Sequence, residues 1–407
     1  MNLWLINHYA ILPQQAGGTR HYTLARELAE RGHRVTIVAS SFDHTTRQEM
    51  HLRDGAPLKL EVVDGVRFLW LKTPPYKGNS VHRLWNTLVF ARKVLSLRVA
   101  DLGGPPDVVL GSSPHLFAAW AAERFANRVQ APFVLEVRDI WPQSLIDLGN
   151  FRESHPFIRV LESIERGLYS RAKRVVTLLP GALEHIVHKG GDSERIVWIP
   201  NGIDLKNVPQ PSRPEDSGSF TVMYAGSHGL ANDLRIILEA ARYIETYHPD
   251  LPIRFFLVGD GPEKPKLMAL AEDMGLSSVR FSPPVSKAGI YEFLRRADAF
   301  IMPLRDSPVF RWGVSPNKLY DYMAMARPVI FAVNTPFDPI QSARAGITVA
   351  PGEPTALAKA AVRLAGMPLE ERWAMGLRGR SYVEANHDLR HLADRLEQTL
   401  EDAIEMG

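Results

Sequence analysis

The chain has 407 residues, enough for two or three domains that each bury a core of their own. Hydrophobic residues make up 45% and charged residues 23% of the sequence, as in ordinary globular proteins, and the net charge is only +3. The sequence contains no cysteine, which excludes disulfides, thiolate zinc sites and cysteine nucleophiles and suits a reducing compartment.

The amino terminus and the apolar runs give no sign of export or of a membrane span. Residues 1–8 lack a basic start followed by a long apolar core, so we expect no signal peptide. No apolar run approaches the ~20 residues that a membrane-spanning helix needs. A cytoplasmic location is therefore expected.

Short apolar runs alternate with longer helical patterns, which predicts parallel sheets with crossover helices. In the first half, strands are expected at residues 3–7, 35–39, 66–71, 107–110, 133–137, 174–178 and 196–199. Helices are expected at residues 19–31, 116–128, 156–171 and 182–189. Residues 201–219 are dense in Pro, Gly, Asn, Asp and Ser, which is typical of a linker.

The alternation then restarts. Strands are expected at residues 220–225, 253–258, 279–281, 299–302, 328–332 and 348–349. Helices are expected at residues 232–247, 263–274, 287–296, 316–325, 355–365, 369–384 and 389–404. The predicted class is α/β, with two doubly wound Rossmann-like domains, residues 1–200 and 220–385, facing each other across a cleft. Ligands are expected at the carboxyl ends of their strands.

Two glycines, Gly17 and Gly18, follow the first expected strand and precede a helix. Paired glycines let backbone N–H groups approach an anion at the helix amino end, although plain tight turns also use them. The pattern is not Gly-x-Gly-x-x-Gly, so a nicotinamide site is not expected.

Residues 67–98 carry seven Lys and Arg and no acidic residue, with Trp70, Trp85 and Phe90 between them. Such a basic amphipathic stretch suits an anionic membrane surface or a lipid-linked phosphate. A solvated helix face is an equally good interpretation. A nucleic-acid partner is not expected, because the domain as a whole is not strongly basic.

Opposite charges, Arg138 and Asp139, directly follow the strand expected at residues 133–137. A doubly wound fold keeps its active site at such carboxyl ends. Asp139 could orient or deprotonate an acceptor hydroxyl and Arg138 could neutralise a phosphate, or the two could form an internal ion pair. His115 follows a neighbouring strand and would border the same wall of the cleft.

Glycine-rich turns end the first two expected strands of the second half. One turn contains Gly226, Ser227, His228 and Gly229, and the other contains Asp260 between two glycines. Each turn alone is compatible with simple chain reversal. Because the carboxyl ends of parallel strands share one edge, the turns together favour a nucleotide pocket.

Residues 299–325 form the most informative stretch. An apolar strand is followed by a loop with Arg305 and Arg311, and a helix is expected to begin at Ser315 with Pro316 in its first turn. Ser is a favoured N-cap residue and Pro is preset for the first helical position. This places Lys318 at the third helical position.

Lys318 would then stand beside the positive end of the helix dipole, where a cation is disfavoured unless an anion joins it. Backbone N–H groups, the dipole and the lysine together describe an anion site. Asp321 could accept hydrogen bonds from ribose hydroxyls, or Lys318 could simply pair with Asp321. No two aspartates are separated by one residue, so no metal and no cofactor are expected.

Several motifs extend over nearly the whole chain. They are residues 16–19 (Ala-Gly-Gly-Thr), 137–142 (Val-Arg-Asp-Ile-Trp-Pro), 199–204 (Ile-Pro-Asn-Gly-Ile-Asp), 224–226 (Tyr-Ala-Gly), 258–262 (Val-Gly-Asp-Gly-Pro), 297–298 (Ala-Asp), 315–321 (Ser-Pro-Asn-Lys-Leu-Tyr-Asp), 322–324 (Tyr-Met-Ala) and 328–330 (Pro-Val-Ile). Together they resemble the retaining nucleotide-sugar transferases of glycosyltransferase family 4, which have the GT-B fold. Within the family, the chain looks most like bacterial O-antigen and capsule transferases, including N-acetyl-L-fucosamine transferases.

The resemblance implies that Asp321 contacts the ribose, whereas the family's other donor-helix glutamate falls at Gly313. The family's Arg and Lys after the first donor-domain strand correspond to Ser227 and Asn232, so Lys318 would have to supply that charge. It also implies that residues 386–407 pack back on the amino-terminal domain. Turns and resemblance together predict a donor site made of Gly17, Gly18, Gly226, Ser227, His228, Gly229, Asp260, Pro284, Val285, Arg305, Gly313, Val314, Ser315, Pro316, Asn317, Lys318, Leu319 and Asp321.

The predicted activity is retaining, metal-independent transfer of a sugar from a nucleotide diphosphate, with UDP favoured by the resemblance, to a lipid-linked saccharide of a bacterial surface polysaccharide. The residues predicted to be catalytic are Asp139, Arg138, Lys318 and His115, and residues 67–98 would contact an anionic membrane. Two alternatives stay open: a UDP-sugar 2-epimerase of the same fold, and a non-catalytic nucleotide-binding subunit of a polysaccharide assembly complex.

Overall fold

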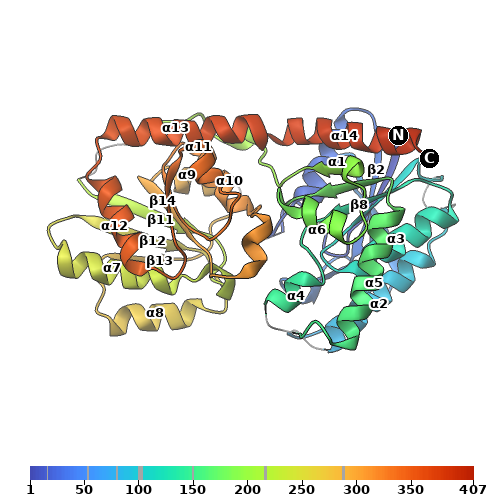
Figure 1. Ribbon diagram of the computed structural model, residues 1–407, viewed down its shortest axis with the longest axis horizontal. Helices are drawn as coiled ribbons and strands as arrows, with labels where there is room; N and C mark the ends of the chain where they lie inside the picture. Colours follow the sequence, from blue (N-terminus) through green and yellow to red (C-terminus); the bar gives the residue numbers. More distant parts are fainter. Residues whose placement is uncertain are drawn as a thin grey trace. The chain divides into compact units, whose positions relative to one another are not determined.

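The computed structural model describes residues 1–15, 17–52, 55–78, 81–99, 104–148, 151–214, 218–286 and 289–407. Within these residues the chain divides into two compact α/β units (Figure 1). Unit 1 contains Met1–Asn201 and Leu389–Gly407, and unit 2 contains Gly202–Asp388. Apart from Asn201, the described part of the segment predicted as a linker therefore belongs to unit 2, and the last helix belongs to unit 1. Ala16 of the first glycine turn and residues 287–288 of one predicted helix lie outside the described residues.

Unit 1 is built on an eight-stranded sheet of order β10-β9-β8-β7-β1-β2-β6-β5. Its strands are β1 (Asn2–Ile6), β2 (Arg34–Ser40), β5 (Leu58–Val63), β6 (Val66–Leu71), β7 (Val108–Ser112), β8 (Phe133–Val137), β9 (Arg174–Thr177) and β10 (Ile196–Trp198). All neighbours pair in parallel except β5, which pairs antiparallel with β6. Two short strands, β3 (Phe42–Asp43) and β4 (Gln48–Glu49), form a separate hairpin.

Helices cover both faces of this sheet. They are α1 (Arg20–Glu30), α2 (Val81–Leu95), α3 (Leu116–Arg128), α4 (Gln143–Asp147), α5 (Pro156–Arg171), α6 (Ala182–His188) and α14 (Leu389–Glu405), with a 3₁₀ turn η2 (Ser193–Arg195). Helices α1 and α14 contact each other, and α14 also contacts β7, β8 and β9, while α3 contacts α2 and α5 (Figure 1). Leucines spaced along α14 at Leu389, Leu392, Leu396 and Leu400 are buried in the core with β1 and β2.

Several elements of unit 1 were not predicted, among them α4, β3 and β4, and the two longest of these elements are strand β5 and helix α2. Strand β5 reads Leu-Lys-Leu-Glu-Val-Val and is mostly exposed, because it is the edge strand, where charges such as Lys59 and Glu61 protect unpaired backbone groups. Helix α2 falls in the basic stretch 67–98. Its buried side is made mostly of small, polar and branched residues, so its helical period is weak in the sequence.

Unit 2 has a six-stranded parallel sheet of order β13-β12-β11-β14-β15-β16. The strands are β11 (Phe220–Ala225), β12 (Ile253–Val258), β13 (Val279–Ser282), β14 (Ala299–Pro303), β15 (Val329–Ala332) and β16 (Gly346–Val349). The central strands are runs of apolar residues, which is typical of parallel strands covered on both faces.

The helices of unit 2 are α7 (Arg235–Tyr247), α8 (Lys264–Asp273), α9 (Ile290–Leu294), α10 (Asn317–Ala324), α11 (Pro339–Ala343), α12 (Pro354–Ala365) and α13 (Leu369–Asn386), with 3₁₀ turns η3 (Leu205–Asn207), η4 (Leu230–Asn232) and η5 (Pro308–Trp312). Side chains of α7, α8 and α12 form one core cluster with the sheet, and those of α10, α11 and α13 form another. The doubly wound α/β fold predicted from the sequence is confirmed in both units.

The strand orders fix where a ligand is expected in each unit. The first strand of unit 1, β1, lies between β2 and β7, and the first strand of unit 2, β11, lies between β12 and β14. At both places the chain winds in opposite directions, which opens a crevice at the carboxyl ends of the central strands. No helix among the described residues is long and apolar enough to cross a membrane.

Candidate functional site

The crevice of unit 2 is bordered by turns that need glycine. A side chain at Gly259 would place its Cβ 2.0 Å from the carbonyl oxygen of Gly226, and one at Gly261 would meet the His228 backbone at 2.5 Å. The His228 N–H donates to the carbonyl of Asp260 at 2.8 Å. The turns after β11 and β12 therefore touch backbone to backbone, so ligand contacts there come from main-chain groups or from neighbouring elements.

The start of helix α10 differs from the prediction. Pro316 is the N-cap residue, with φ −81° and ψ 126°, and no side chain caps the helix, so Ser315 is not the N-cap. Proline has a fixed φ that also suits the extended conformation of an N-cap residue, so the Ser-Pro pair did not determine the register. Lys318 is consequently the second helical residue, and the first backbone N–H groups of α10 have no side-chain cap.

The amine of Lys318 lies at the turn after β11. Its Nζ donates to Tyr224 Oη at 2.8 Å and to Asn232 Oδ1 at 2.6 Å, and it lies 4.8 Å from the centre of the Tyr224 ring. A Cβ on Gly226 would come within 3.3 Å of it. Burial lowers the pKa of Lys318 to about 8, so the ammonium dominates at neutral pH but is poorly solvated. A bound anion would stabilise this charge.

The two hydrogen-bond partners of Lys318, Tyr224 and Asn232, are themselves held by the turn after β11. Tyr224 Oη donates to the Ser227 carbonyl at 2.6 Å, and Asn232 Nδ2 donates to the same oxygen at 2.9 Å. One turn along α10, Tyr322 Oη donates to the Ala225 carbonyl at 2.8 Å and accepts from the Ala225 N–H at 2.7 Å. Lys318 and Tyr322 lie on one helix face, so both fasten α10 to the end of β11. The Lys318 amine therefore lies beside Asn232, at the turn after β11.

The other predicted donor residues of unit 2 are spread around this edge. Asp321 accepts a hydrogen bond from Tyr291 Oη at 3.0 Å, and the backbone N–H of Arg305 donates to the Ala231 carbonyl at 3.0 Å. The imidazole of His228 is fully buried between Tyr224 and Phe281, and neither ring nitrogen makes a hydrogen bond among the described residues.

The remaining predicted donor residues at this edge differ in their solvent exposure. Those that are exposed are Ser227, Asp260, Pro284, Arg305 and Asn317. Those that are partly buried are Gly226, Gly229, Val285, Ser315 and Pro316, while Gly313, Val314 and Leu319 are buried. The predicted roles of all these residues in donor binding stay predictions.

Gly313 has a backbone conformation that explains its identity. Its φ is +105°, which L side chains rarely adopt, and its N–H donates to the Phe310 carbonyl at 3.0 Å. A glutamate here would be strained, so the family's usual glutamate cannot be restored by substitution alone.

We expect Gly313→Glu to lower the free energy of unfolding by about 1–3 kcal/mol through backbone strain and to lower any sugar-transfer rate. Urea titration and a turnover assay would measure both. An increase in turnover with unchanged stability would contradict the strained-backbone explanation.

In unit 1, the glycine turn leads into α1. Gly17 has φ +138°, and a Cβ there would lie 2.9 Å from Ile11 Cδ1, so glycine is required. Thr19 is the N-cap residue of α1 but its side chain makes no capping hydrogen bond. Uncapped N–H groups at this helix end remain compatible with the predicted phosphate contact of Gly17 and Gly18.

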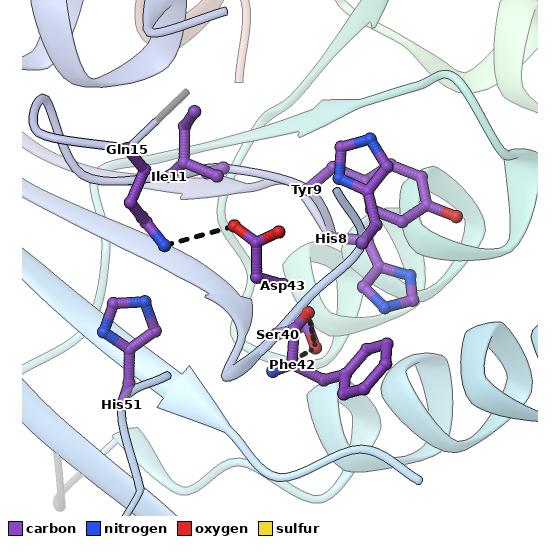
Figure 2. Close-up of a pocket in the computed structure, with 10 residues that line it drawn as sticks. His8, Tyr9, Ile11, Gln15, Ser40, Phe42, Asp43 and His51 are labelled. Atoms are coloured by element: carbon purple, nitrogen blue, oxygen red, sulfur yellow. Dashed lines mark hydrogen bonds between the residues drawn. The ribbon is translucent and has the colours of Figure 1, made fainter. Parts of the chain in front are cut away.

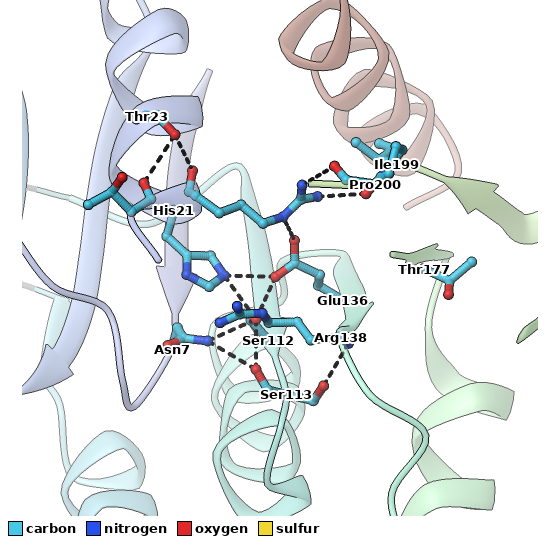
Figure 3. A network of polar contacts seen from close by, with 12 residues as sticks. Asn7, His21, Thr23, Ser112, Ser113, Glu136, Arg138, Thr177, Ile199 and Pro200 are labelled. Carbon is cyan, nitrogen blue, oxygen red and sulfur yellow. Dashed lines mark hydrogen bonds and ion pairs between the residues drawn. The ribbon is translucent and has the colours of Figure 1, made fainter. Parts of the chain in front are cut away.

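A buried polar network joins the carboxyl ends of the unit 1 strands (Figure 3). Glu136, at the end of β8, accepts from Arg20 Nε at 2.8 Å and lies 2.8 Å from His21 Nε2 and 2.5 Å from Ser112 Oγ. Arg20 also donates to the carbonyls of Ile199 and Pro200. Burial opposes ionisation of Glu136, but the Arg20 charge and His21 hold its pKa well below the usual range.

This network was missed from the sequence, although one signal was present. Glu136 is the only charged residue within a strand that reads Phe-Val-Leu-Glu-Val, and a buried carboxylate must be paired. The network is structural in character. It fixes the amino end of α1 against β7 and β8, and it holds the chain at Pro200, just before the boundary of unit 1.

His115 and His8 form a contact at the crevice of unit 1. His115 is the N-cap residue of α3, and its Nδ1 accepts from the Ala118 N–H at 3.3 Å, so its Nε2 carries the proton. That Nε2 lies 2.6 Å from His8 Nδ1. Burial lowers the pKa of His115 to about 3 and that of His8 well below its ordinary value. His115 is therefore a neutral imidazole with hydrogen-bond contacts at both ring nitrogens. Its role in catalysis stays a prediction.

These shifts make stability depend on pH. The pKa of His115 is lower in the folded chain than the ordinary 6.5, so the unfolded state takes up its proton first as the pH falls. We expect the free energy of unfolding to decline below pH 6.5, with His115 contributing about 1.4 kcal/mol per pH unit between pH 6 and 4. In His115→Asn, which keeps an N-cap residue, the free energy of unfolding from urea titrations should fall less steeply with decreasing pH, by that amount per pH unit. The same pH dependence in variant and wild type would contradict this account.

Arg138 and Asp139 lie at the predicted strand end but do not pair with each other. The Arg138 N–H donates to Ser113 Oγ at 2.8 Å, and Asp139 is exposed. No ion pair joins Arg138 and Asp139 in the described part of the chain. The interpretation as an internal Arg–Asp ion pair is therefore wrong. Asp139 is exposed as a residue, yet burial around its carboxyl raises the pKa of that group, and the nearby Arg138 charge partly offsets this rise.

The cations of the basic stretch 67–98 come from different elements, and the predicted membrane contact of this stretch stays a prediction. Arg67 lies within β6, Lys72 and Lys77 in the following loop, and Arg92 on α2, so the cations are spread over three kinds of element. A small polar cavity of unit 1, of about 10 Å³, is lined by Tyr9, Gln15 and Asp43 among others (Figure 2). Within it, Gln15 Nε2 donates a hydrogen bond to Asp43 at 3.2 Å. The cavity has room for about one water molecule, not for a substrate.

Comparisons with known proteins agree with this architecture. Residues 16–202 match a family model described as "Glycosyl transferase 4-like domain", and residues 219–366 match one described as "Glycosyl transferases group 1". A relative named "Putative colanic acid biosynthesis glycosyl transferase WcaI", from Escherichia coli strain K12, is 22% identical over 313 residues, covering 73% of this chain and 75% of that one.

Solved structures show the same fold. Sucrose-phosphate synthase from Thermosynechococcus elongatus superposes with a TM-score of 0.73 at 18% identity, covering 100% of both chains. Anabaena Alr3699/HepE in complex with UDP-glucose superposes with a TM-score of 0.68 at 15% identity, covering 98% of this chain and 99% of that one. The fold is therefore GT-B.

Proposed function

Since the chain is a glycosyltransferase with a family 4-like domain followed by a group 1 domain, we propose that it transfers a sugar from a UDP-sugar to a lipid-linked saccharide, with retention and without a metal ion. The observation that carries the donor half is the Lys318 amine, held by Tyr224 and Asn232 at the crevice of unit 2. The UDP-glucose in the Anabaena neighbour supports the choice of nucleotide.

In the proposed reaction the bond between the anomeric carbon and the diphosphate oxygen breaks, the acceptor hydroxyl oxygen forms the new bond to that carbon, and the hydroxyl proton passes to the departing diphosphate. The departing diphosphate gains negative charge, which the Lys318 ammonium and the uncapped N–H groups at the start of α10 would stabilise. The Asp139 carboxylate would orient the acceptor hydroxyl, with the Arg138 charge beside it at the same strand end. The name of the Escherichia coli relative supports a surface polysaccharide as the product.

A thermal-shift series tests the donor half. UDP at 100 times its dissociation constant should stabilise the protein by about 2.7 kcal/mol, in EDTA as well as in Mg²⁺, whereas GDP and ADP should shift the melting temperature less. UDP-sugars that bind would then be incubated with and without lipid extracts. Transfer only with acceptor supports the proposal. A sugar altered without acceptor indicates an epimerase, and binding without any turnover indicates a non-catalytic subunit.

A further inference from the structure

A large apolar cavity opens from the crevice of unit 1. It measures about 480 Å³, within the size range of small-molecule sites. At one end it is lined by residues that follow three strands: Tyr9 after β1, Pro114 and His115 after β7, and Trp141 after β8. The cavity therefore begins at the strand ends where the acceptor is expected.

Away from the strands the cavity is almost entirely hydrophobic. Its walls come from α2, α3, α4 and α5, with Leu84, Phe117, Leu145 and Phe157 as the lining side chains. Phe117 and Phe157 are neighbours, with ring centres 6.5 Å apart. A ligand in this part of the cavity would be held by burial of apolar surface.

Two polar side chains of the lining, Thr87 and His115, already make hydrogen bonds within the protein. The Thr87 hydroxyl donates to the Leu84 carbonyl at 2.7 Å, and both ring nitrogens of His115 are within bonding distance of His8 and Ala118. A saccharide in the walls would leave its hydroxyls without partners, which is costly in an apolar site. A hydrocarbon chain meets no such penalty.

Among the described residues that line the cavity, the one charged side chain is the cation Arg83. Its guanidinium lies 6.0 Å from the centre of the Tyr9 ring, at the end nearest the strands. Its charge lowers the pKa of both His8 and His115, although burial is the larger cause for each. An anionic group is therefore favoured at the strand end of an otherwise apolar site.

The outer rim of the cavity continues into an exposed apolar row on α2. Val81 lines the cavity and is 80% exposed, and Trp85 and Leu88 follow on the same helix face, 57% and 39% exposed. Helix α2 contains no acidic residue, and Arg92 extends the same face. An apolar row with cations beside it suits the headgroup region of an anionic bilayer.

We infer that this cavity binds the lipid chain of the acceptor, a prenyl-type hydrocarbon esterified to phosphate, with the chain between α2, α3, α4 and α5 and the phosphate beside Arg83. The role of this lipid as an acceptor rests on the proposed function, but its binding to the cavity does not require a nucleotide. A lipid entering from the bilayer would pass Val81 and present its phosphate and first sugar at the ends of β1, β7 and β8.

Farnesyl monophosphate is a suitable probe, because it is soluble and carries a short prenyl chain on one phosphate. Its binding to the full chain, without nucleotide or membrane, would be measured by calorimetry, with farnesol, inorganic phosphate and a free oligosaccharide as comparison ligands. We expect binding at least about tenfold tighter than that of farnesol or phosphate, because chain and charge are both recognised. Equal competition by the oligosaccharide would overturn the inference in favour of a sugar subsite.

Matched variants locate the site. Leu145→Gln changes the cavity wall, whereas Leu148→Gln changes the exposed leucine that directly follows the same short helix. Arg83→Gln removes the lining cation, whereas Arg92→Gln removes an exposed cation of the same helix α2. We expect Leu145→Gln and Arg83→Gln to weaken farnesyl phosphate binding about tenfold and the two controls to change it less than about twofold.

Wild-type protein gives a second readout that needs no variant. A prenyl phosphate with a photoreactive diazirine on its chain should label peptides containing Phe117, Leu145 or Phe157. Labelling elsewhere, equal effects of wall and control variants, or binding only to anionic vesicles would each contradict a lipid-chain cavity.

The thermal shift with UDP, measured on the same samples, separates the two proposals. Loss of prenyl phosphate binding with an intact UDP shift overturns only the cavity. Prenyl phosphate binding without any UDP binding overturns only the proposed transferase.

Discussion

Replacing Lys318 by Ala should lower turnover of a UDP-sugar by about 10²–10³-fold while leaving thermal stability nearly unchanged. The ammonium would lie at the charge that develops on the departing diphosphate, and loss of one such preorganised donor typically costs about 2.7–4 kcal/mol of transition-state stabilisation. The protein loses little stability, because the cost of burying the ammonium, which lowers the pKa of Lys318 to about 8, offsets the hydrogen bonds to Tyr224 and Asn232 that are lost with it.

Two companion variants make this result specific. Lys266→Ala removes a lysine that is 75% exposed in the same unit and should leave turnover within about twofold. In the wild type, kcat/KM should fall as the pH rises through about 8, since the amine then loses its proton. Lys318→Arg should remove that limb, because arginine stays charged. Equal turnover in Lys318→Ala and wild type would contradict the role of the amine.

Glu136→Gln should have the largest effect on stability, lowering the free energy of unfolding by about 3–5 kcal/mol. Glu136 and Arg20 are both buried, and removal of one partner of a buried ion pair leaves the other charge uncompensated. The carboxylate also accepts from Ser112, and Arg20 holds the chain at Ile199 and Pro200, so several contacts weaken together.

Urea unfolding of Glu136→Gln would be compared with Glu162→Gln, which breaks the partly exposed pair between Glu162 and Lys189 and should cost at most about 1 kcal/mol. The double variant Arg20→Met, Glu136→Leu should recover much of the loss, because both charges are removed together. A cost below about 1 kcal/mol for Glu136→Gln would show that the network of Figure 3 does not hold unit 1 together.

The sequence allowed the layers of this fold to be predicted because parallel strands covered on both faces leave a simple pattern. Strands such as Phe133–Val137 and Ile253–Val258 are apolar runs with one charged residue each, Glu136 and Arg254, and their predicted bounds agree with the structure. Edge strand β5 and helix α2 escaped prediction, because their exposed positions carry leucine, valine and tryptophan alongside charges.

Site geometry was predicted less completely, because it depends on contacts between residues distant in the chain. The helix start near Lys318 was predicted within two residues, but not that its amine reaches Tyr224 and Asn232, 94 and 86 positions away. Similarly, His115 was selected as a single histidine, whereas its chemistry is set by His8, 107 positions away. Neither partner can be inferred from local spacing.

A crystal structure of the protein with UDP, grown in the presence of Mg²⁺, tests the central claim most directly. We predict that the diphosphate lies within hydrogen-bonding distance of Lys318 Nζ and of the backbone N–H groups of Asn317 and Lys318, with no cation between the phosphates and the protein. A diphosphate bound away from α10, or one that chelates a metal ion held by carboxylates, would contradict the proposed mechanism.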